Sequence, residues 1–417
     1  MRPPSPAPAS ITIPAPLNWQ SPHGRPLPAG IDPAGLRTLV MAILNVTPDS
    51  FSDGGQFHST RAVVDRAGML LEEGADLLDV GGESTRPGHM PVSEAEEQAR
   101  VLPVIEALRK AFPATPLSID THRASVARAA IRAGADIIND IWGGMSGMDV
   151  AVWRAWREAG VGIAGATPQS PIPPARSEKP DKPKPLPLPY EAKNLPLSAG
   201  HRRQPDNSNK LNNSNNPDNS NNSDTPAPPP PTPHTAPPDS TSGAANAANA
   251  ADAATPPISP MARVMAEARC PVILMHNRVS GRDYTDFWPD VLLDLRASIA
   301  MARAAGVAEN QLWLDPGIGF AKDAAENLEV LRSLGRIAAL GHPVLLGTSR
   351  KSTIGRVLDE PMPARRGAGT AATLVWGVQQ GARMVRVHDV AAMRPFLRMA
   401  DAIRSGLMWR KAPPILF

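Results

Sequence analysis

Residues 41–55 read MAILNVTPDSFSDGG, a run that begins apolar and turns abruptly polar. Strand interiors exclude proline, aspartate and paired glycine, so a strand that starts in the apolar half must end near Asn45. The polar half carries one aromatic residue, Phe51, and is either an ordinary surface turn or a loop that contacts a ligand. The residues that surround this run in the chain decide between these two interpretations.

The same change from a short apolar run to polar residues recurs along the chain. The first run spans 38–44, and seven more follow at 76–80, 117–120, 135–141, 271–275, 311–314, 343–346 and 383–387. Helical patterns follow these runs at 60–73, 93–111, 123–133, 289–305, 322–335, 364–380 and 388–405. Almost continuously apolar strands that alternate with helices predict a parallel sheet covered on both faces. At this length we predict an α/β fold, the (β/α)8 or TIM barrel, with a doubly wound open sheet as the alternative.

Several helix starts carry N-cap residues. Ser93 with Glu96 forms a capping-box pattern, and Asp286 precedes another helical run. Two segments compete for the fourth helix: 148–160, capped by Asp149, and 259–268, which begins with Ser and Pro. If the second segment is the barrel helix, the residues between the two belong to a loop at the catalytic face, and we favour this arrangement. If it is the first, they leave from the opposite end.

Composition divides the chain into four stretches. Residues 1–35 form an irregular, proline-rich lead-in, and residues 36–166 form the first part of the barrel. Residues 167–259 are rich in Pro, Asn, Ser and Ala, and residues 260–412 form the second part of the barrel. The third stretch has too little apolar surface to offset the entropy of ordering it. We therefore predict a long, disordered, low-complexity insertion between strands four and five.

Composition also limits the partners and the compartment. The 417 residues carry a formal net charge of only +3, too small by itself to indicate nucleic-acid binding. No apolar run approaches the roughly 18 residues that a membrane span needs. The single cysteine, Cys270, excludes an intramolecular disulfide and suits a reducing compartment. We expect a cytoplasmic protein that binds neither nucleic acid nor membranes.

Hydrogen-bonding or charged residues follow all eight predicted strands. In a (β/α)8 barrel the active site lies at these carboxyl ends, so we expect the side chains to converge. Asp120, Asn139 and Asp315 are short groups that can pair with the amino and lactam edges of a flat heterocycle. Met275 and Phe320 can form an apolar slot around its faces.

Basic residues at other strand ends suit a phosphate group. They are Arg350, Lys351, Arg386 and His388. No His, Cys or Glu cluster has zinc-ligand spacing, so any metal would be Mg²⁺ held by Asn45 and the phosphates of a substrate. The strand ends together indicate a heterocycle, a diphosphate and a second, anionic substrate.

Eight motifs, in order, resemble those of the dihydropteroate synthase family. They are LNVTPDSFSDGG, DVGGESTRPG, SIDT, NDI, PVILMHNR, LDPGIGFAK, GTSRKS and RVHDV. The resemblance implies a folate-pathway transferase that condenses (7,8-dihydropterin-6-yl)methyl diphosphate with 4-aminobenzoate, through early loss of the diphosphate to a pterin-methyl cation. It also implies Mg²⁺ as cofactor and a homodimer. Two alternatives stay open: a corrinoid-type pterin-binding methyltransferase domain, which needs no diphosphate clamp, and a non-catalytic pterin-binding protein.

The resemblance further assigns roles to residues, motif by motif. The catalytic residues would be Asp53, Lys351, Arg386 and His388. The pterin would be held by Asp120, Asn139, Ile141, Met275, Asp315, Phe320 and Lys351. The diphosphate would be held by Asn45, Thr85, Arg386 and His388, with Asn45 also the metal ligand. The 4-aminobenzoate would be held by Phe51, Thr85, Arg86, Pro87 and Ser352. The polar half of residues 41–55 is then a mobile loop that closes over the site.

Overall fold

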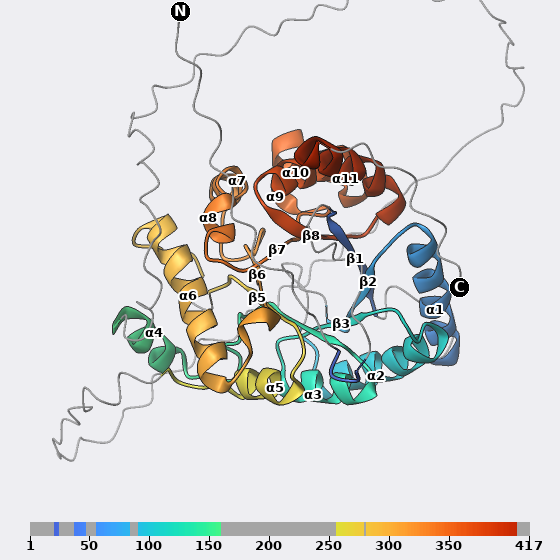
Figure 1. The fold of residues 1–417 in the computed structure, drawn as a ribbon, viewed down its shortest axis with the longest axis horizontal. Helices are drawn as coiled ribbons and strands as arrows, with labels where there is room; N and C mark the ends of the chain where they lie inside the picture. Colours follow the sequence, from blue (N-terminus) through green and yellow to red (C-terminus); the bar gives the residue numbers. More distant parts are fainter. Residues whose placement is uncertain are drawn as a thin grey trace, which may run out of the picture. The chain divides into compact units, whose positions relative to one another are not determined.

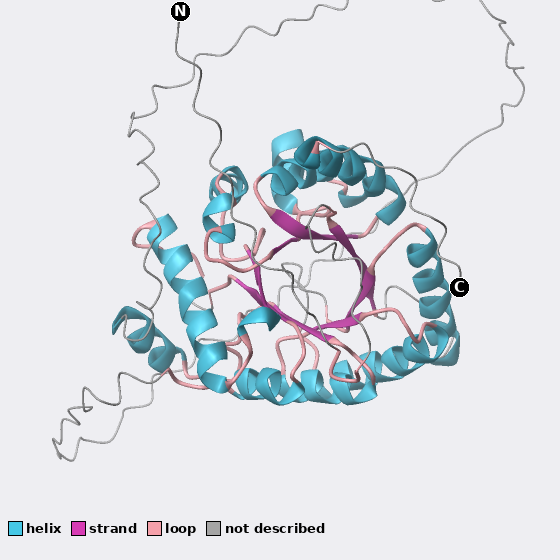
Figure 2. Cartoon of the chain, in the orientation of Figure 1, coloured by secondary structure: helices cyan, strands magenta, loops and turns pink. Residues whose placement is uncertain are grey.

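Eight parallel strands form one closed barrel in the computed structural model, which describes residues 21–24, 37–46, 56–83, 91–159, 256–278 and 281–406. Each strand pairs with its neighbour in sequence, and β1 (Leu39–Asn45) pairs with β8 (Ala382–Val387) to close the ring. Figure 1 shows the helices around the barrel, and Figure 2 shows the strands at its centre. The closed ring confirms the predicted (β/α)8 barrel and excludes the open sheet.

The other strands and the helices alternate along the chain. The remaining strands are β2 (Leu77–Gly81), β3 (Leu117–Asp120), β4 (Ile137–Asp140), β5 (Val272–Met275), β6 (Leu312–Asp315) and β7 (Val344–Leu346). The helices are α1 (Gln56–Glu72), α2 (Glu94–Ala111), α3 (Ala124–Ala133), α4 (Val150–Ala159), α5 (Pro260–Ala268), α6 (Phe287–Ala305), α7 (Ala324–Arg332), α8 (Gly335–Ala338), α9 (Ser352–Leu358), α10 (Gly367–Gln379) and α11 (Val390–Ser405). Short 3-10 turns lie at Glu309–Gln311 and Pro363–Arg365.

The helix starts differ from the sequence prediction at one cap. Ser93 Oγ accepts a hydrogen bond from Glu96 N at 3.2 Å, which confirms the N-cap half of the predicted capping box, whereas the Glu96 carboxylate pairs with Arg100. Asp286 makes no side-chain cap, and α6 begins at Phe287 rather than near 289. The carboxylate of Asp290, inside the first turn, accepts from Thr285 N at 2.8 Å instead. The side-chain cap was wrongly predicted because the third residue of α6 is Pro289, which has no N–H to donate to the Asp286 carboxylate.

Two further helices differ from the sequence pattern. The predicted helix 322–335 is divided into α7 and α8, with Ser333 at the C-cap of α7 and a glycine opening α8. The short helix α9, directly after β7, has no counterpart among the predicted helices. Its seven residues are too few to show a helical period in the sequence.

Both segments that competed for the fourth helix are helical. α5 packs between α3 and α6 and is therefore the barrel helix, whereas α4 contacts α6 from outside the ring (Figure 1). Ser259 Oγ accepts from Ala262 N at 2.8 Å, and Asp149 Oδ1 accepts from Ala151 N at 2.7 Å. Residues 160–255, which hold most of the predicted insertion, lie outside the described residues. In chain order they belong to the β4–α5 connection, which starts at the catalytic face.

Side chains that point into the barrel change character along the strands. Near the amino ends they form an apolar cluster of Leu39, Met41, Leu77, Ile137, Ile273, Trp313, Leu345 and Met384. Because successive side chains alternate between the two faces of a strand, the next inward position lies two residues further on. That position is polar in several strands, as at Asp79, Asn139, Asp315 and Arg386. Apolar side chains therefore fill the barrel near the amino ends of the strands, and polar side chains line it near the carboxyl ends.

Part of the predicted lead-in contacts the barrel at the amino ends of its strands. Ser21 Oγ donates to Asp136 Oδ1 at 2.5 Å, and His23 Nε2 lies 3.2 Å from Ala135 O. Asp136 and Ala135 directly precede β4, so these contacts lie at the amino ends of the strands. Among the helices of the described ranges, none is both long enough and apolar enough to cross a membrane.

Candidate active site

A cavity of about 270 Å³ opens at the carboxyl ends of the strands. All eight strands, or the residues directly after them, contribute to its lining. The cavity brings together every described residue that the sequence placed in the site: Asn45, Asp120, Asn139, Ile141, Met275, Asp315, Phe320, Lys351, Ser352, Arg386 and His388. The other five candidates, Phe51, Asp53, Thr85, Arg86 and Pro87, lie outside the described residues.

Arg386 binds residues of two other strands across the cavity, and a third strand joins through Asp79. Its Nε donates to Asp79 Oδ2 at 2.6 Å on β2, and its Nη2 donates to Asp120 Oδ2 at 2.6 Å on β3. Asn139 Nδ2 on β4 donates to the same Asp79 oxygen at 3.2 Å. Burial by itself lowers the pKa of Arg386, but Asp79 and Asp120 outweigh this and raise it above its ordinary value. The guanidinium is therefore a fixed positive charge at the base of the cavity.

Asp79, the first residue of the motif DVGGESTRPG, was assigned no role from the sequence. Asp79 is fully buried, and its Oδ1 has no hydrogen-bond partner among the described residues. A signal was available, because an aspartate inside the apolar run LLDVG must face inward or be paired. Its partners were not readable from the sequence, since Arg386 is 307 positions away.

Two carboxylates of the cavity hold their protons more tightly than usual. Burial raises the pKa of Asp120 to about 7, with Arg386 opposing and Asp79 adding to the increase. Burial likewise raises the pKa of Asp315 to about 6, opposed by the hydrogen bond from Gly317 N to Asp315 Oδ1 at 2.7 Å. Desolvated acids in a cavity are typical of sites that gain their hydrogen-bond partners from a ligand.

Lys351 and Phe320 form one wall of the cavity. The Lys351 ammonium nitrogen lies 4.3 Å from the centroid of the Phe320 ring, a cation–π contact. Gly319, beside them, has φ +84°, and a Cβ there would lie 3.2 Å from Lys351 Cδ. Lys351 also precedes α9, whose first residue is Ser352. One wall thus offers an aromatic face, a positive charge and a hydroxyl together.

Two neighbours orient the basic residues after β7 and β8. Ser349 Oγ lies 3.0 Å from His388 Nδ1 and accepts from His388 N at 3.2 Å, which holds the imidazole against the β7 loop. Arg350, expected from the sequence to face a phosphate, instead donates from Nε to Asp389 Oδ2 at 3.0 Å. Its charge is balanced by that carboxylate, so it suits an anion less than Lys351, whose ammonium faces the Phe320 ring.

Arg366 also lines the cavity, and the sequence gave no sign of it. Its guanidinium donates to the carbonyl oxygens of Arg350 at 2.9 Å, Glu360 at 3.0 Å and Pro361 at 2.6 Å. Arg350 has φ +60°, a left-handed conformation uncommon for arginine. Arg366 therefore braces the backbone of the loop that presents Lys351 and Ser352.

The side chains that line the cavity limit which metal ion it could bind. In the part of the chain that the structure describes, no group of three or more His, Cys, Asp or Glu could hold a metal ion. Asn45, the last residue of β1, is among the residues that line the cavity. One neutral oxygen ligand is compatible with Mg²⁺, which usually keeps several waters and binds through substrate phosphates, and not with zinc.

These features define the class of the protein. Buried carboxylates facing an arginine, a lysine and a histidine at the mouth of a (β/α)8 barrel form an enzyme site for a small, partly anionic molecule. The profile of the family described as "Pterin binding enzyme" matches residues 41–176 and 246–388. The residues between these two matches, 177–245, all fall within the predicted insertion.

Individual relatives show which enzymes within this family the chain is similar to. The dihydropteroate synthase of Bacillus subtilis is 37% identical over 367 residues, 88% of this chain and 89% of its own. A Clostridium difficile dihydropteroate synthase, crystallised with pteroic acid, is 33% identical with a TM-score of 0.59, over 88% of this chain and 97% of that one. The Xanthomonas albilineans enzyme, in complex with 7,8-dihydropteroate, is 31% identical with a TM-score of 0.55, over 88% and 94%. The chain belongs to the dihydropteroate synthase family and is a transferase of that type. This favours the synthase over the methyltransferase and non-catalytic alternatives.

Proposed function

We propose that this protein joins (7,8-dihydropterin-6-yl)methyl diphosphate to 4-aminobenzoate, giving 7,8-dihydropteroate and pyrophosphate in folate biosynthesis. One observation carries the proposal. A single cavity holds Asp120, Asn139 and Asp315 together with Lys351 and Arg386. This substrate requires hydrogen-bond acceptors for its heterocycle and positively charged side chains for its diphosphate.

The deep part of the cavity suits the pterin. The carboxylate of Asp315 and the amide of Asn139 can pair with the amino and lactam edge of the ring, and Asp120 can accept from it beside Arg386. The side chains of Met275 and Ile141 offer apolar contact to the ring faces. Desolvation of the acids favours this pairing, because ring N–H donors replace the water that burial removed.

The proposed reaction needs no strong general base. The bond from the methylene carbon to the diphosphate oxygen breaks, and its electron pair leaves with the diphosphate. The amine nitrogen of 4-aminobenzoate then forms the new bond to carbon and gives up a proton. Arg386, Lys351 and His388 would stabilise the charge that develops on the departing diphosphate. An aniline is already nucleophilic, so the residues mainly orient the reactants and neutralise charge.

Mg²⁺ is part of the proposal, with Asn45 as its ligand from the protein. When bound, the ion would neutralise part of the diphosphate charge. Asn45 lines the cavity, and its amide oxygen is a hard donor of the kind that such an ion requires.

The second substrate would approach from the rim. Ser352 and Lys351 lie at the start of α9 and can receive the carboxylate of 4-aminobenzoate. Phe51, Asp53, Thr85, Arg86 and Pro87 lie outside the described residues, and their assigned roles stay predictions.

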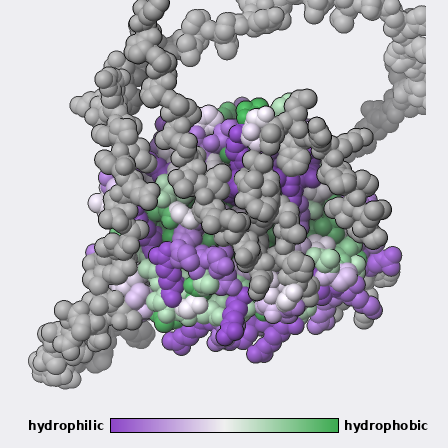
Figure 3. Space-filling model, viewed as in Figure 1, coloured by the Kyte–Doolittle hydropathy of each residue, from purple (hydrophilic) through white to green (hydrophobic). Residues whose placement is uncertain are grey.

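We further propose that the protein is a cytoplasmic homodimer that pairs through α10 and α11. Phe396, Met399 and Ile403 lie on one face of α11 and are 47%, 63% and 64% exposed. Trp376 on α10 is 48% exposed. The apolar surface at the upper edge of Figure 3 lies over these helices. Light scattering should give twice the chain mass, and Met399→Asp with Ile403→Asp should give the monomer.

Pyrophosphate release tests the proposed reaction. Purified protein is incubated with Mg²⁺, the pterin methyl diphosphate and 4-aminobenzoate, beside an Asp120→Ala variant. We expect release that requires both substrates and is lost in the variant. A folded protein that binds the pterin but releases no pyrophosphate in the presence of both substrates would refute the proposal.

A further inference from the structure

Lys322 is a buried lysine that lies behind the active-site cavity and does not line it. The residue is only 8% exposed and ends the β6–α7 loop. Its Nζ lies 2.7 Å from His276 Nδ1, and it donates to Gly317 O and Phe320 O at 3.2 Å each. Three acceptors therefore surround one nitrogen, and two of them are carbonyls of the loop that faces the cavity.

The partners of His276 show which atoms carry the protons. His276 Nε2 lies 3.1 Å from Asp294 Oδ2, and Asp294 has a pKa held below its usual value despite burial, by its bonds with His276 and Arg278. An ionised carboxylate only accepts, so Nε2 donates to it. Burial lowers the pKa of His276 to about 4, so the ring is neutral and Nδ1 is an acceptor. Lys322 must then donate all three of its N–H groups.

The charged form of Lys322 is the one that satisfies this arrangement. Burial lowers the pKa of Lys322 to about 7, while Asp315 and Asp294 oppose the decrease. Below that pH the ammonium supplies one donor to each of the three acceptors. A lysine replaced by an apolar side chain would leave two carbonyls and one imidazole nitrogen buried without this donor, which is costly.

The loop that Lys322 holds carries several of the cavity groups. Ile318, Gly319 and Phe320 line the cavity, and Gly317 N donates to the Asp315 carboxylate at 2.7 Å. Gly317 has φ +65°, and a Cβ there would lie 1.9 Å from His276 O. The loop is therefore pressed against the end of β5, with Lys322 tying it to the same residue, His276.

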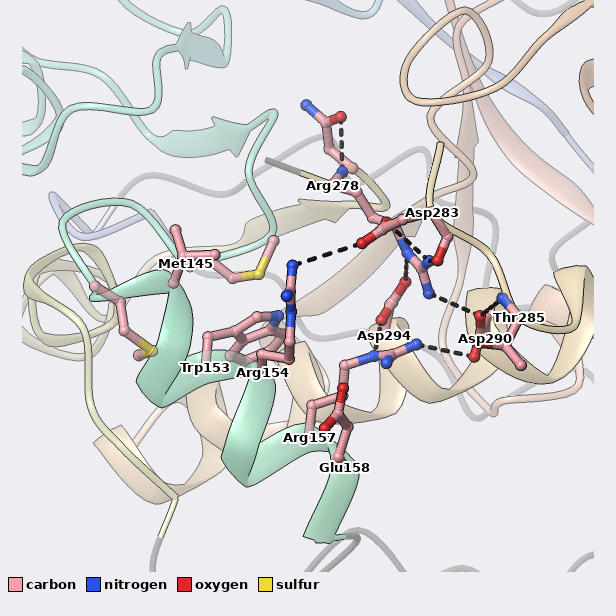
Figure 4. A pocket seen from close by; sticks show the side chains of 13 residues that line it. Met145, Trp153, Arg154, Arg157, Glu158, Arg278, Asp283, Thr285, Asp290 and Asp294 are labelled. Carbon is pink, nitrogen blue, oxygen red and sulfur yellow. Dashed lines mark hydrogen bonds and ion pairs between the residues drawn. The ribbon is translucent and has the colours of Figure 1, made fainter. Parts of the chain in front are cut away.

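The same set of contacts continues outward to α4. Asp294 accepts from Arg278 Nε at 2.7 Å and forms an ion pair with Arg157 of α4 (Figure 4). Arg157 Nη2 also donates to Asp290 Oδ1 at 3.1 Å. These residues line a second cavity of about 250 Å³. Its arginines and aspartates already pair with one another, so we assign it no ligand and regard it as the attachment of α4.

We propose that Lys322, His276 and Asp294 form a positioning relay that holds the β6–α7 loop in the conformation lining the active-site cavity, with Arg157 as its outer anchor. Lys322 acts through the loop backbone and is not a catalytic residue. The relay rests on the proposed function only where it names the pterin as the ligand that the loop receives.

Hydrogen exchange and pterin binding test the inner end of the relay at pH 6.5. In Lys322→Met we expect amide protection over residues 317–321 and pterin affinity each to fall about tenfold, because a buried charged donor is lost. Val330→Ala, a buried position in α7, is the control for a general loss of stability. It should lower the melting temperature without changing either quantity. Unchanged protection in Lys322→Met, or the same changes in Val330→Ala, would overturn the relay.

Two arginines of α4 allow a test of the outer end of the relay. Arg157 pairs with Asp294, whereas Arg154 lies 3.6 Å from the exposed Asp283. The side chain of Arg154 is 52% exposed and that of Arg157 is 13% exposed, and both lie on α4 outside the barrel ring, so both variants should fold. We expect Arg157→Met to weaken pterin binding about two- to fivefold and Arg154→Met to leave it unchanged, since exposed ion pairs contribute little. Equal effects of the two variants would remove Arg157 from the relay.

The two readouts separate the relay from the proposed function. If the wild-type protein binds no pterin, the proposed function fails, yet the exchange of residues 317–321 in Lys322→Met still decides whether the lysine holds the loop. If pterin binds and exchange is unchanged, the function stands and the relay fails.

Discussion

Arg386 Nη2 and Asp120 Oδ2 lie 2.6 Å apart, and Arg386 Nε lies equally close to Asp79 Oδ2. Without the guanidinium, Asp79 and Asp120 would be two buried carboxylates that lack this positive charge between them. We expect Arg386→Gln to weaken binding of inorganic pyrophosphate about 10- to 100-fold, since charge-assisted hydrogen bonds contribute roughly 1.5–3 kcal/mol. Isothermal titration calorimetry measures this directly.

Arg350→Gln is the matched control. Arg350 also lines the cavity, but it pairs with Asp389 at the rim. We expect pyrophosphate binding to change by less than about threefold, as is usual for a partly exposed ion pair. Similar losses in both variants would mean that only the summed charge matters and not the place of Arg386.

Asp315 should make pterin binding depend on pH. Burial raises the pKa of Asp315 to about 6, and its ionised form is the acceptor that a pterin N–H needs. Pterin affinity should therefore increase from pH 5 to pH 7.5. The increase should be smaller in Asp315→Asn, whose overall affinity should be about tenfold weaker. An identical pH profile in the two proteins would assign the titration to another group, such as Asp120.

The same group has the opposite effect on stability. Its folded pKa of about 6 lies above the unfolded value of about 3.9, so the folded state binds the extra proton between these values. The contribution of Asp315 to stability therefore decreases as pH rises from about 4 to about 6. Asp315→Asn should gain on the order of 1–2 kcal/mol relative to wild type between pH 4.5 and pH 7.5. Urea unfolding at the two pH values would contradict this if the difference stayed constant.

Gly317 should tolerate no side chain. It combines φ +65° with a close approach to His276 O, where a Cβ would lie only 1.9 Å away. We expect Gly317→Ala to lower the unfolding free energy by more than about 2 kcal/mol or to displace the β6–α7 loop, with loss of pterin binding. Gly341→Ala is the control, because Gly341 has φ +92° and open space around it. It should cost only about 1 kcal/mol. Equal costs would show that the close contact with His276 is not limiting.

The sequences of the strands themselves predict much of the barrel and of its cavity. In Leu77–Gly81 and Val272–Met275, the apolar runs mark strands buried on both faces, and the residues at their carboxyl ends must meet because the strands are parallel. That is why Asp120, Asn139 and Asp315 were predicted to share one site although they lie in three different motifs.

The contacts between strands were not readable in the same way. The pairing of Asp79 with Arg386 depends on how the barrel closes, and a period of two in each strand does not carry that information. Arg366 and Lys322 act through backbone carbonyls of neighbouring loops, which leave no residue pattern. The cap at Asp286 failed because Pro289, three residues further on, has no N–H to donate to the carboxylate.

The inserted segment should be dispensable for the reaction. Residues 177–245 lie outside both stretches that match the family profile, and their composition is low in apolar residues. The elements on either side, α4 and α5, each have their own cap and their own contact with α6. We expect deletion of 177–245 to leave kcat/KM within a few-fold of wild type, because shortening a loop changes its closure entropy only slowly with length. Pyrophosphate release by the deletion variant measures this, with the circular dichroism melt as the check on folding. A folded variant with activity reduced about 100-fold or more would show that the segment contributes to substrate binding or loop closure, and loss of solubility would show that it protects the barrel surface.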